Sequence, residues 1–507
     1  MNRKYNIAFL FLALCLLGSA CGKEEGVVSP DPIEKPSPDI EFEVAEGMDL
    51  VGIVTDAKTS QPIPGVVVSD GYTCAKTDGK GIYQLKRGRD AVFVYYSVPS
   101  QYEVNATKGI PTFYAKVDHS TSIFRKDFQL NPLAQPEDKF TLFCIADPQC
   151  KTDANIARFK DETIRDLQLF TKNYTASYGV TLGDIVFDTP GLFSSMKGAM
   201  NVENLKIFQT IGNHDHYENG TSEKHCIQNY QNTFGPTDYS FNRGKTHIVV
   251  MDNVIYNAKQ SYDAGFSAAQ VAWLKQDLAF VPKDYMVILC VHIPTRNSAS
   301  VQRCKEVYDL MKPFAEAHVM SGHTHYNQNY KITTHGIYEH IHGAACGNWW
   351  SCTINGDGAP NGYGVYEIEG NHISNWFYKG TNLDQKEQIR MYPIGSFSDN
   401  TNNLVANIWN ADEDWEVKVY ENGVYTGDME RFSGYEKAVY QFFYQVMKKP
   451  LPGTPTGSTS WYRRPDHMFK YIPQSTDAKF EIRATDRFGN VYVQDQFVSD
   501  FKPFQSY

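Results

Sequence analysis

The chain has 507 residues, of which 42% are hydrophobic and 21% charged, and its 32 Tyr, 30 Phe and 7 Trp provide material for several hydrophobic cores. This composition excludes an intrinsically disordered chain, and the length predicts about three domains. The formal net charge is -10, and the sequence contains no stripe of Lys and Arg. We therefore expect no dedicated nucleic-acid-binding protein, and a nuclease is disfavoured, because a phosphate backbone would be repelled.

Residues 1–21 have the pattern of a bacterial secretory signal peptide. Two basic residues precede an apolar run from Ile7 to Leu17, and small residues stand before Cys21. This arrangement resembles a lipobox, whose cysteine is lipidated; the alternative is an ordinary signal cleaved near Ala20. We expect an exported protein that is lipid-anchored at the bacterial outer membrane, and the acidic residues after Cys21 indicate the cell surface. No later run reaches the ~18 apolar residues of a membrane span.

Two regions precede the centre of the chain. Residues 22–47 are rich in Pro and acidic residues, which is typical of a flexible linker. Residues 48–133 contain short alternating apolar runs separated by turns such as Asp78-Gly79, which predicts a small β-sandwich. This region resembles the carboxypeptidase regulatory-like modules. It contains no catalytic cluster, so we expect it to serve as a spacer or packing partner.

Residues 134–380 alternate between strand-like and helix-like patterns, which is typical of a layered α/β domain. We predict strands at residues 140–146, 178–182, 207–211, 247–251, 285–291 and 318–320, and helices at 153–174, 266–281 and 301–312. Residues 381–507 return to short strands and turns, such as Asn422-Gly423, and predict a second β-sandwich.

Five short polar motifs follow apolar runs of the central region. They are 147–149 (DPQ), 183–188 (GDIVFD), 212–215 (GNHD), His292 and 322–325 (GHTH). The carboxyl ends of strands in α/β sheets open into a crevice where sites form. Mixed oxygen and imidazole donors suit Mn, Fe, Co or Zn. A shared carboxylate would hold two ions ~3.5 to 4 Å apart, the geometry of two-metal phosphoester hydrolysis.

In this order the motifs resemble the calcineurin-like metallophosphoesterases. The resemblance implies a four-layer α/β/β/α sandwich, here flanked by the two β-domains, and two metal ions with one shared ligand. It assigns the first ion to Asp147, Gln149, Asp184 and His325, and the second to Asp184, Asn213, His292 and His323.

The resemblance also implies catalytic roles for two residues of the third motif. His214 would stabilise the transition state or protonate the leaving oxygen, and Asp215 would orient it. Gln149 stands where many members have His, which favours Mn or Mg. We expect two divalent ions, with Mn preferred and Fe, Zn or Mg as alternatives. Phe187 stands where purple acid phosphatases have a metal-binding Tyr, which argues against a charge-transfer Fe(III) centre.

Several residues after the last metal motif are candidates for the wall of a substrate pocket. They are Asn348, Trp349, Trp350, Asp357 and Tyr363. Tandem Trp can stack on a sugar or base, and the alternative is that both pack a domain junction. For the remaining histidines we expect packing or surface roles; these are His216, His225, His335, His340 and His342.

These observations predict a hydrolase that cleaves a phosphate ester of a nucleotide, glycan or lipid head group outside the cytoplasm, through a hydroxide activated by two metals. Because the sequence shows no Arg- or Lys-rich loop near the motifs, we favour a diester, or a pyrophosphate-like bond, over a monoester. The membrane would be contacted only through the lipid. The alternatives are a protein phosphatase and a catalytically inactive, glycan-binding surface lipoprotein.

Overall fold

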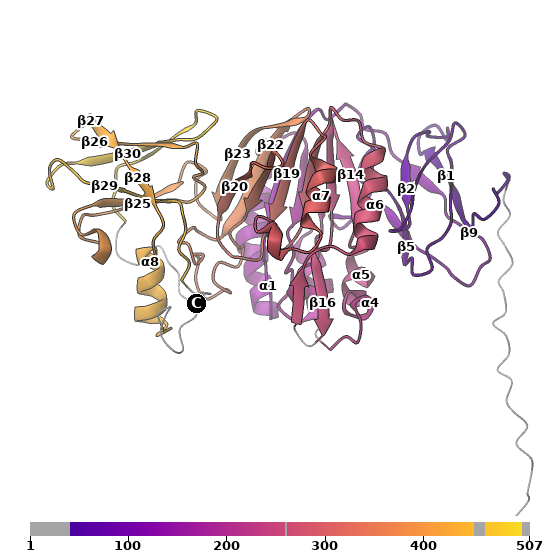
Figure 1. Ribbon diagram of the computed structural model, residues 1–507, viewed down its shortest axis with the longest axis horizontal. Coiled ribbons are helices and arrows are strands. Elements are labelled where there is room, and N and C mark those ends of the chain that lie inside the picture. Colours follow the sequence, from indigo (N-terminus) through magenta and orange to yellow (C-terminus); the bar gives the residue numbers. More distant parts are fainter. Residues whose placement is uncertain (1–40, 218, 259–260, 451–461, 499–507) are drawn as a thin grey trace, which may run out of the picture.

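The computed structural model describes residues 41–217, 219–258, 261–450 and 462–498. An N-terminal β-domain, a central α/β core and a C-terminal β-domain follow one another along its longest axis (Figure 1). The predicted signal peptide, Cys21 and the linker up to residue 40 lie outside the described residues. Within them, every helix is too short or too polar to cross a bilayer.

The N-terminal domain consists of two packed sheets. Its first sheet contains β1 (Leu50–Asp56), β4 (Ile82–Leu85), β9 (Phe124–Arg125) and β10 (Phe128–Leu130). Its second sheet has the order β3 (Cys74–Lys76), β2 (Val67–Ser69), β5 (Phe93–Tyr96) and β8 (Tyr114–Lys116), and β6 (Ala106–Thr107) pairs with β7 (Ile110–Pro111). Apolar side chains such as Val54, Val68 and Tyr96 are buried, which confirms the predicted sandwich.

The core contains two mixed sheets. The five-stranded sheet has the order β13 (Lys206–Phe208), β12 (Ser177–Thr181), β11 (Lys139–Ile145), β22 (Gly362–Glu369) and β23 (His372–Gly380). The six-stranded sheet has the order β14 (Tyr239–Arg243), β15 (Thr246–Val250), β18 (Met286–Cys290), β19 (Glu316–Ser321), β21 (Ile337–Ile341) and β20 (Gln328–Ile332). Strands β12, β15 and β18 are buried at every residue, as expected for strands covered on both faces.

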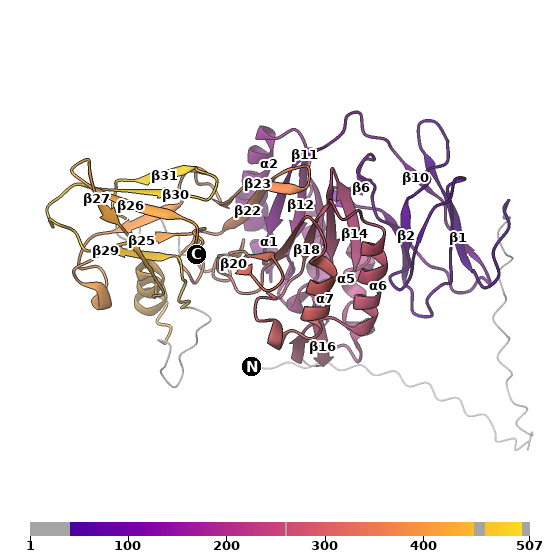
Figure 2. The same ribbon diagram turned by 45° about the horizontal axis from the view of Figure 1, so that its top comes forward.

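Helices cover the outer face of each sheet, so the four-layer α/β/β/α prediction is confirmed (Figures 1 and 2). On the five-stranded sheet lie α1 (Asp153–Phe159), a π-helical turn (Lys160–Ile164), α2 (Arg165–Phe170) and α3 (Phe193–Ala199). On the six-stranded sheet lie α6 (Ala268–Ala279) and α7 (Cys304–Met311). The smaller elements are α4 (Glu223–Cys226), α5 (Gln228–Phe234), the hairpin β16 (Val254–Ala258) and β17 (Ser261–Ala264), and 3-10 turns at Thr171–Asn173, Pro190–Leu192, Asn213–Asp215 and Ser298–Ser300.

Local chemistry explains two helix starts. At α6, Ser267 Oγ accepts the N–H of Gln270, and the Gln270 side chain accepts the N–H of Ser267, which satisfies free backbone donors of the first turn. Helix α7 begins three residues later than predicted, because Arg303 has a left-handed conformation with φ 56°.

The C-terminal domain is a second sandwich of two four-stranded sheets, as predicted. The first has the order β24 (Ile389–Tyr392), β25 (Leu404–Ile408), β29 (Met468–Tyr471) and β28 (Glu430–Phe432), and the second β27 (Val424–Asp428), β26 (Glu416–Glu421), β30 (Phe480–Thr485) and β31 (Val491–Gln494). The sequence-based prediction missed the 3-10 turn Ser398–Asn400, α8 (Lys437–Tyr440) and the following π-helix (Gln441–Val446). Their aromatic residues Phe442 and Phe443 are buried against Tyr462.

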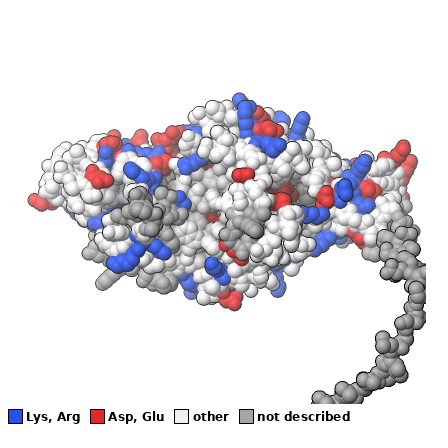
Figure 3. All heavy atoms as spheres, turned by 60° about the horizontal axis from the view of Figure 1, so that its bottom comes forward, with Lys and Arg blue, Asp and Glu red and all other residues white. Residues whose placement is uncertain are grey.

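The surface carries mixed charge. On the face drawn in Figure 3, Lys and Arg side chains are interspersed with Asp and Glu and form no continuous stripe.

Candidate metal centre and active site

The seven candidate ligands all follow the carboxyl ends of core strands. Asp147 and Gln149 follow β11, Asp184 follows β12, Asn213 follows β13, His292 follows β18, and His323 and His325 follow β19. The first four come from the five-stranded sheet and the three histidines from the six-stranded sheet. The candidate site therefore lies where the carboxyl ends of both sheets meet.

The imidazole of His292 is surrounded by acceptor atoms. Its Nδ1 lies 2.7 Å from the carbonyl of Leu182, so Nδ1 carries a proton and Nε2 is the nitrogen that faces the centre. Around Nε2 lie Asn213 Oδ1 at 3.0 Å, His323 Nδ1 at 3.2 Å and Asp184 Oδ1 at 3.3 Å. Acceptor atoms that converge in a buried position require a cation or a proton between them.

A second set of acceptors lies on the other side of Asp184. Gln149 Nε2 donates to Asp184 Oδ2 at 2.7 Å, and the N–H of His323 donates to Asp147 Oδ2 at 2.8 Å. Three further buried atoms have no hydrogen-bond partner in the described chain: Asp147 Oδ1, Gln149 Oε1 and His325 Nδ1. Asp147 Oδ1 lies 3.4 Å from His325 Nε2.

These two donor sets fit two divalent cations. Asp184, His292 and His323 place ligand atoms within 4.8 Å of one another. Asp184 presents one oxygen to each set, which suits a shared ligand. The nitrogen and oxygen donors are those of intermediate divalent ions.

Backbone strain is concentrated at this site. Among the described residues, fifteen non-glycine residues have positive φ, and eight of them belong to the motifs or to the loop after β21; these are Asp147, Gln149, Asp184, Asp188, His323, His325, Trp349 and Trp350. Such conformations cost about 1 to 3 kcal/mol each and persist where the surroundings enforce them. The polar side chains are therefore held in position at the expense of stability.

Two motif glycines make room for ligand side chains. A Cβ at Gly212 would lie 2.3 Å from Asp184 Oδ1, and one at Gly322 would lie 2.5 Å from Asp147 Oδ2. Any larger residue would displace these carboxylates, which explains glycine at the start of both motifs.

The electrostatics of the site depend on Asp184. Burial raises the pKa of this carboxyl, but His292 and His214 outweigh burial and hold the pKa well below its usual value. Burial lowers the pKa of His292, yet Asp184 outweighs it and the pKa rises to about 9. Burial and the neighbouring His292 lower the pKa of His323 to about 3. Asp184 is therefore ionised and His323 neutral, the states that bind a cation, whereas His292 carries a proton on Nε2 that a bound cation would displace.

His214 lies beside this centre and is held by three residues. Its Nδ1 lies 2.8 Å from Asp188 Oδ1, and its ring stacks on Phe187 with centroids 4.2 Å apart. Its backbone N–H donates to Asp184 Oδ1 at 2.9 Å. Burial lowers the pKa of His214, but Asp184 and Asp188 outweigh burial and the pKa rises. The ring can therefore carry a proton on Nε2, the nitrogen that Asp188 leaves free.

The predicted role of Asp215 is wrong. Its carboxylate does not touch the His214 ring but accepts the N–H groups of Ile185 at 3.1 Å, Val186 at 3.0 Å and Gly212 at 2.9 Å. Asp215 thus ties the second motif to the third. The orienting carboxylate is Asp188, the last residue of the GDIVFD motif, for which the sequence predicted no role.

The two tandem tryptophans differ in their surroundings. The ring of Trp349 lies 5.0 Å from that of His325, so Trp349 borders the centre. Trp350 is buried: its Nε1 donates to the carbonyl of Pro148 at 2.9 Å, and Arg158 lies over its ring. The substrate-wall prediction for Trp350 is therefore wrong, because its indole anchors the loop. Asn348 is buried, and neither side-chain polar atom has a partner in the described chain.

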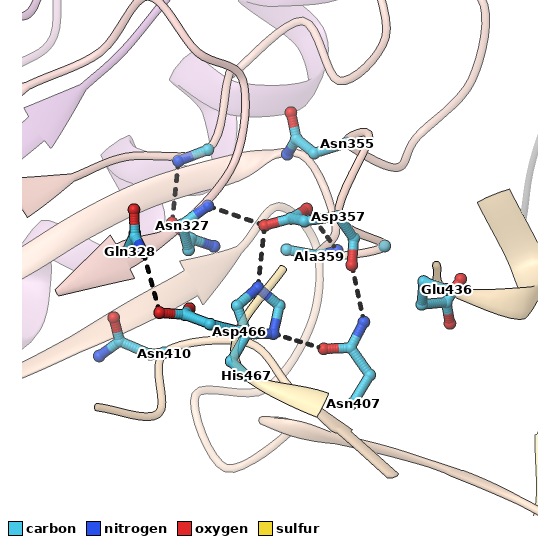
Figure 4. Close-up of polar contacts among 12 residues, drawn as sticks. Asn327, Gln328, Asn355, Asp357, Ala359, Asn407, Asn410, Glu436, Asp466 and His467 are labelled. Carbon is cyan, nitrogen blue, oxygen red and sulfur yellow. Dashed lines mark hydrogen bonds and ion pairs between the residues drawn. The ribbon is translucent and has the colours of Figure 1, made fainter. Parts of the chain in front are cut away.

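Asp357 and Tyr363 are structural residues and not part of a substrate wall. Asp357 is buried in a network between the core and the C-terminal domain, where Oδ2 accepts the N–H of Asn327 at 2.7 Å and lies 3.3 Å from His467 Nε2 (Figure 4). Tyr363 is buried and its hydroxyl donates to Asp166 at 2.7 Å. Both predictions are corrected, because these polar groups are already occupied within the fold.

The structure also reveals a basic cavity that the sequence analysis missed. A cavity of about 450 Å³ is lined by Arg296, Tyr326 and Arg463, among others. The Arg296 guanidinium donates to the Tyr326 hydroxyl at 2.8 Å, and the Arg463 guanidinium lies 5.7 Å from the Tyr326 ring. Arg296 follows His292 by only four residues, so its place in the sequence is a signal that it lies near the centre. Arg463 comes from a distant segment, and no local pattern indicates it.

Most of the remaining histidines have packing or surface roles, as predicted. His340 and His342 are buried, and their Nδ1 atoms lie 2.9 Å from Asn329 Oδ1 and from the carbonyl of Ser321 respectively. His225 is exposed and His335 half-buried.

Comparison with known families gives consistent matches over most of the chain. Residues 48–133 match the N-terminal domain, residues 140–327 the central domain, and residues 339–492 the C-terminal domain of the family described as calcineurin-like phosphoesterase. The resemblance of residues 48–133 to carboxypeptidase regulatory-like modules stays a prediction.

No curated protein matches the chain. Among solved structures, a purple acid phosphatase from yellow lupin is 11% identical over 54% of this chain, with a TM-score of 0.32, and the match spans about half (51%) of that enzyme. A phosphopantetheinyl hydrolase from Mycobacterium tuberculosis is 11% identical over 41% of this chain and 91% of its own, with a TM-score of 0.28.

Proposed function

The chain belongs to the calcineurin-like phosphoesterases, a family of phosphoric ester hydrolases, and from this premise we propose that it is a two-metal hydrolase of phosphate esters. The observation that carries the proposal is the convergence of Asn213, His323 and Asp184 acceptor atoms on His292 Nε2, next to His214. A purely structural cluster would pair these acceptors with donors.

The first ion would be held by Asp147, Gln149, Asp184 and His325, and the second by Asp184, Asn213, His292 and His323. When bound, the two ions supply charge neutralisation of the phosphate and activation of the attacking water. Manganese is our preferred metal, because the amide oxygen of Gln149 is a harder donor than imidazole, and Fe, Zn and Mg are the alternatives.

The chain's own residues supply the proton for the leaving group. Asp188 holds His214 Nδ1, which leaves Nε2 free to donate a proton, and the raised pKa of His214 favours the protonated ring. Asp215 fixes the two loops that carry Asp184 and His214 by accepting three backbone N–H groups. A neutral leaving alcohol results when His214 donates its proton to the leaving oxygen.

The cavity around Tyr326 supports a substrate with a second negative charge. Arg296 and Tyr326 follow the candidate ligands His292 and His325 closely in the chain, and Arg463 adds a second guanidinium. Guanidinium groups bind phosphate and carboxylate in bidentate fashion. We favour a diester or pyrophosphate-like bond in a nucleotide, glycan or lipid head group, in which these arginines would bind an anionic group beside the scissile phosphate. The argument from a lack of basic residues no longer applies.

Trp349 and Asn348 are the remaining candidates for substrate contact. The Trp349 ring beside His325 offers an aromatic face for a sugar or base, and the Asn348 amide offers unused donors and acceptors.

We place the enzyme outside the cytoplasm, lipid-anchored through Cys21 at the outer membrane and exposed at the cell surface. Protease treatment of intact cells tests this location.

Two alternatives make different predictions. A protein phosphatase would act on phosphopeptides more efficiently than on small diesters. An inactive glycan-binding lipoprotein would purify without stoichiometric metal, and the complete donor set at Asp184 argues against it.

The decisive experiment uses metal-stripped protein restored with Mn²⁺, Zn²⁺, Mg²⁺ or Fe²⁺ and compares bis-p-nitrophenyl phosphate with p-nitrophenyl phosphate. We expect metal-dependent turnover that Asp184→Ala abolishes. Arg296→Gln should raise KM for substrates whose leaving group is anionic. Arg464→Gln is the matched control, because Arg464 lines the same cavity but lies over the Tyr435 ring. Absence of both turnover and bound metal would contradict the proposal.

A further inference from the structure

A second group of potential metal ligands lies apart from the seven catalytic candidates. His216, Glu223 and Asp252 place ligand atoms within 4.8 Å of one another. His216 directly follows the GNHD motif, Glu223 begins α4, and Asp252 follows β15. From the sequence alone, only a packing or surface role is expected for His216.

Each of the three side chains is already oriented by a backbone group. His216 Nδ1 lies 2.8 Å from the carbonyl of Gly212, so its Nε2 faces the two carboxylates. Glu223 Oε2 accepts the N–H of Tyr256 at 2.8 Å, and Asp252 Oδ1 accepts the N–H of Val254 at 2.9 Å. The other oxygens, Glu223 Oε1 and Asp252 Oδ2, lie 3.2 and 3.3 Å from His216 Nε2.

This arrangement is the one found around metal ions in proteins. A metal-binding histidine donates its other ring N–H to a carbonyl or carboxylate, and ligating carboxylates are themselves hydrogen-bonded. The three atoms that face one another here are the three that backbone groups leave unused. His216 is fully buried, whereas the Glu223 side chain is 44% exposed, which leaves a path for entry.

The surroundings of the cluster are strongly acidic. A cavity of about 290 Å³ between the N-terminal domain and the core is bordered by five acidic residues, namely Asp70, Asp90, Glu223, Asp238 and Asp252. Among its described lining residues there is no Lys or Arg. Burial and the charge of Asp252 raise the pKa of Asp238 to about 7. Beside these carboxylates a divalent cation would neutralise more negative charge than the single imidazolium of His216 does.

We propose that His216, Glu223 and Asp252 bind a third divalent cation, at the boundary between the N-terminal domain and the core. One imidazole and two carboxylates favour Zn²⁺ or Mn²⁺ over Ca²⁺, and water from the cavity completes the coordination. This ion takes no part in the hydrolysis. It connects the end of the GNHD turn to α4 and to the loop after β15, and so stabilises the turn that carries His214.

The test counts bound metal in the whole protein. Protein stripped with a chelator is titrated with Zn²⁺ or Mn²⁺, separated from free metal and analysed by elemental mass spectrometry. We expect Glu223→Gln to bind one ion fewer than the wild type and to lose part of the metal-induced rise in Tm. Asp90→Asn is the matched control, since Asp90 borders the same cavity but pairs with Lys224 at 3.3 Å.

Because the result is a difference between variants, it does not depend on whether the catalytic ions are bound. Equal metal content and equal affinity in wild type and Glu223→Gln would overturn the proposal and leave an imidazolium paired with two carboxylates. Anomalous scattering from crystals grown with Zn²⁺ provides a check that needs no variant. A peak beside His216 Nε2 supports the site, and its absence overturns it.

Discussion

The Nδ1 atom of His214 lies 2.8 Å from Asp188 Oδ1, whereas the carboxylate of the adjacent Asp215 accepts only backbone N–H groups. Asp215, the next residue in the chain, therefore fixes the loops, and Asp188 from the GDIVFD motif orients the imidazole of His214. This division of roles can be tested residue by residue.

Asp188→Asn should lower kcat by ~10-fold or more with little change in KM, because the imidazole loses the acceptor that fixes its tautomer and supports its proton. The pH profile should change as well, with activity falling at a lower pH than in the wild type. In the His214→Ala background, Asp188→Asn should have little additional effect on kcat. Independent, multiplicative losses would contradict a positioning role.

Asp215→Asn should destabilise the fold, because its carboxylate accepts three buried N–H groups and an amide would direct its own N–H groups at one of them. We expect a loss of about 1 to 3 kcal/mol in the free energy of unfolding. Denaturant unfolding of metal-free protein measures it. Unchanged stability together with a lost pH dependence of kcat would restore Asp215 as the residue that orients His214.

Asp184→Ala and His214→Ala should separate metal binding from proton transfer. The first variant removes the carboxylate shared by both donor sets, so bound metal should fall together with activity. The second should retain its metal and lose ~10²-fold or more in kcat. Metal analysis and turnover on the same samples distinguish the two. Full metal binding in Asp184→Ala would contradict the shared-ligand assignment.

Glu339→Gln should change stability in a pH-dependent way. Burial raises the pKa of Glu339 from 4.5 to about 7, so the folded protein takes up a proton that the unfolded chain releases above pH 4.5. Wild-type stability from this group is therefore present at low pH and is lost as pH rises from about 4.5 to 7. At pH 8 the variant should be more stable than the wild type by up to about 3 kcal/mol in the free energy of unfolding, and its Tm should be higher. At pH 4 neither quantity should increase. An equal difference at both values would contradict the shift.

Trp349→Ala should change KM and not Tm, whereas Trp350→Ala should lower Tm. Trp350 is buried and donates to Pro148, so its removal should cost about 3 kcal/mol or more and lower Tm. Trp349 borders His325, so its removal should raise KM with little change in Tm. Melting curves and steady-state kinetics on both variants are the measurement. A destabilised Trp349→Ala with unchanged KM would place Trp349 in the fold alone.

The sequence predicted the fold class and the ends of most of the core strands that it identified, because buried strands produce continuous apolar runs and the motifs directly follow them. It missed the remaining strands of the two core sheets, which are β14, β20, β21, β22 and β23. β18, for example, lies within the predicted strand at 285–291. The positions of side chains around the centre were harder to predict. Asp188 and Asp215 carry the same chemical group within their motifs, and only the path of the backbone decides which one reaches His214.

Contacts between distant segments could not be predicted. Arg463 reaches Tyr326 from the C-terminal domain, and Asp357 meets His467 across the domain boundary. These pairs are more than a hundred residues apart, so no local periodicity relates them. The π-helix at Gln441–Val446 was missed for a different, local reason: its adjacent aromatic residues are typical of a strand.

Strand β22 runs antiparallel to β11 and occupies the interior of the five-stranded sheet, although it begins only at Gly362. During synthesis all seven candidate ligands have emerged by His325, yet β11 still has one open edge until Glu369 has been made. An incomplete chain that ends after the GHTH motif would therefore expose the unpaired edge of β11 to other nascent chains. Core assembly has to wait for this late strand, so a gene fragment bounded by the motifs alone should yield aggregates and not a minimal enzyme.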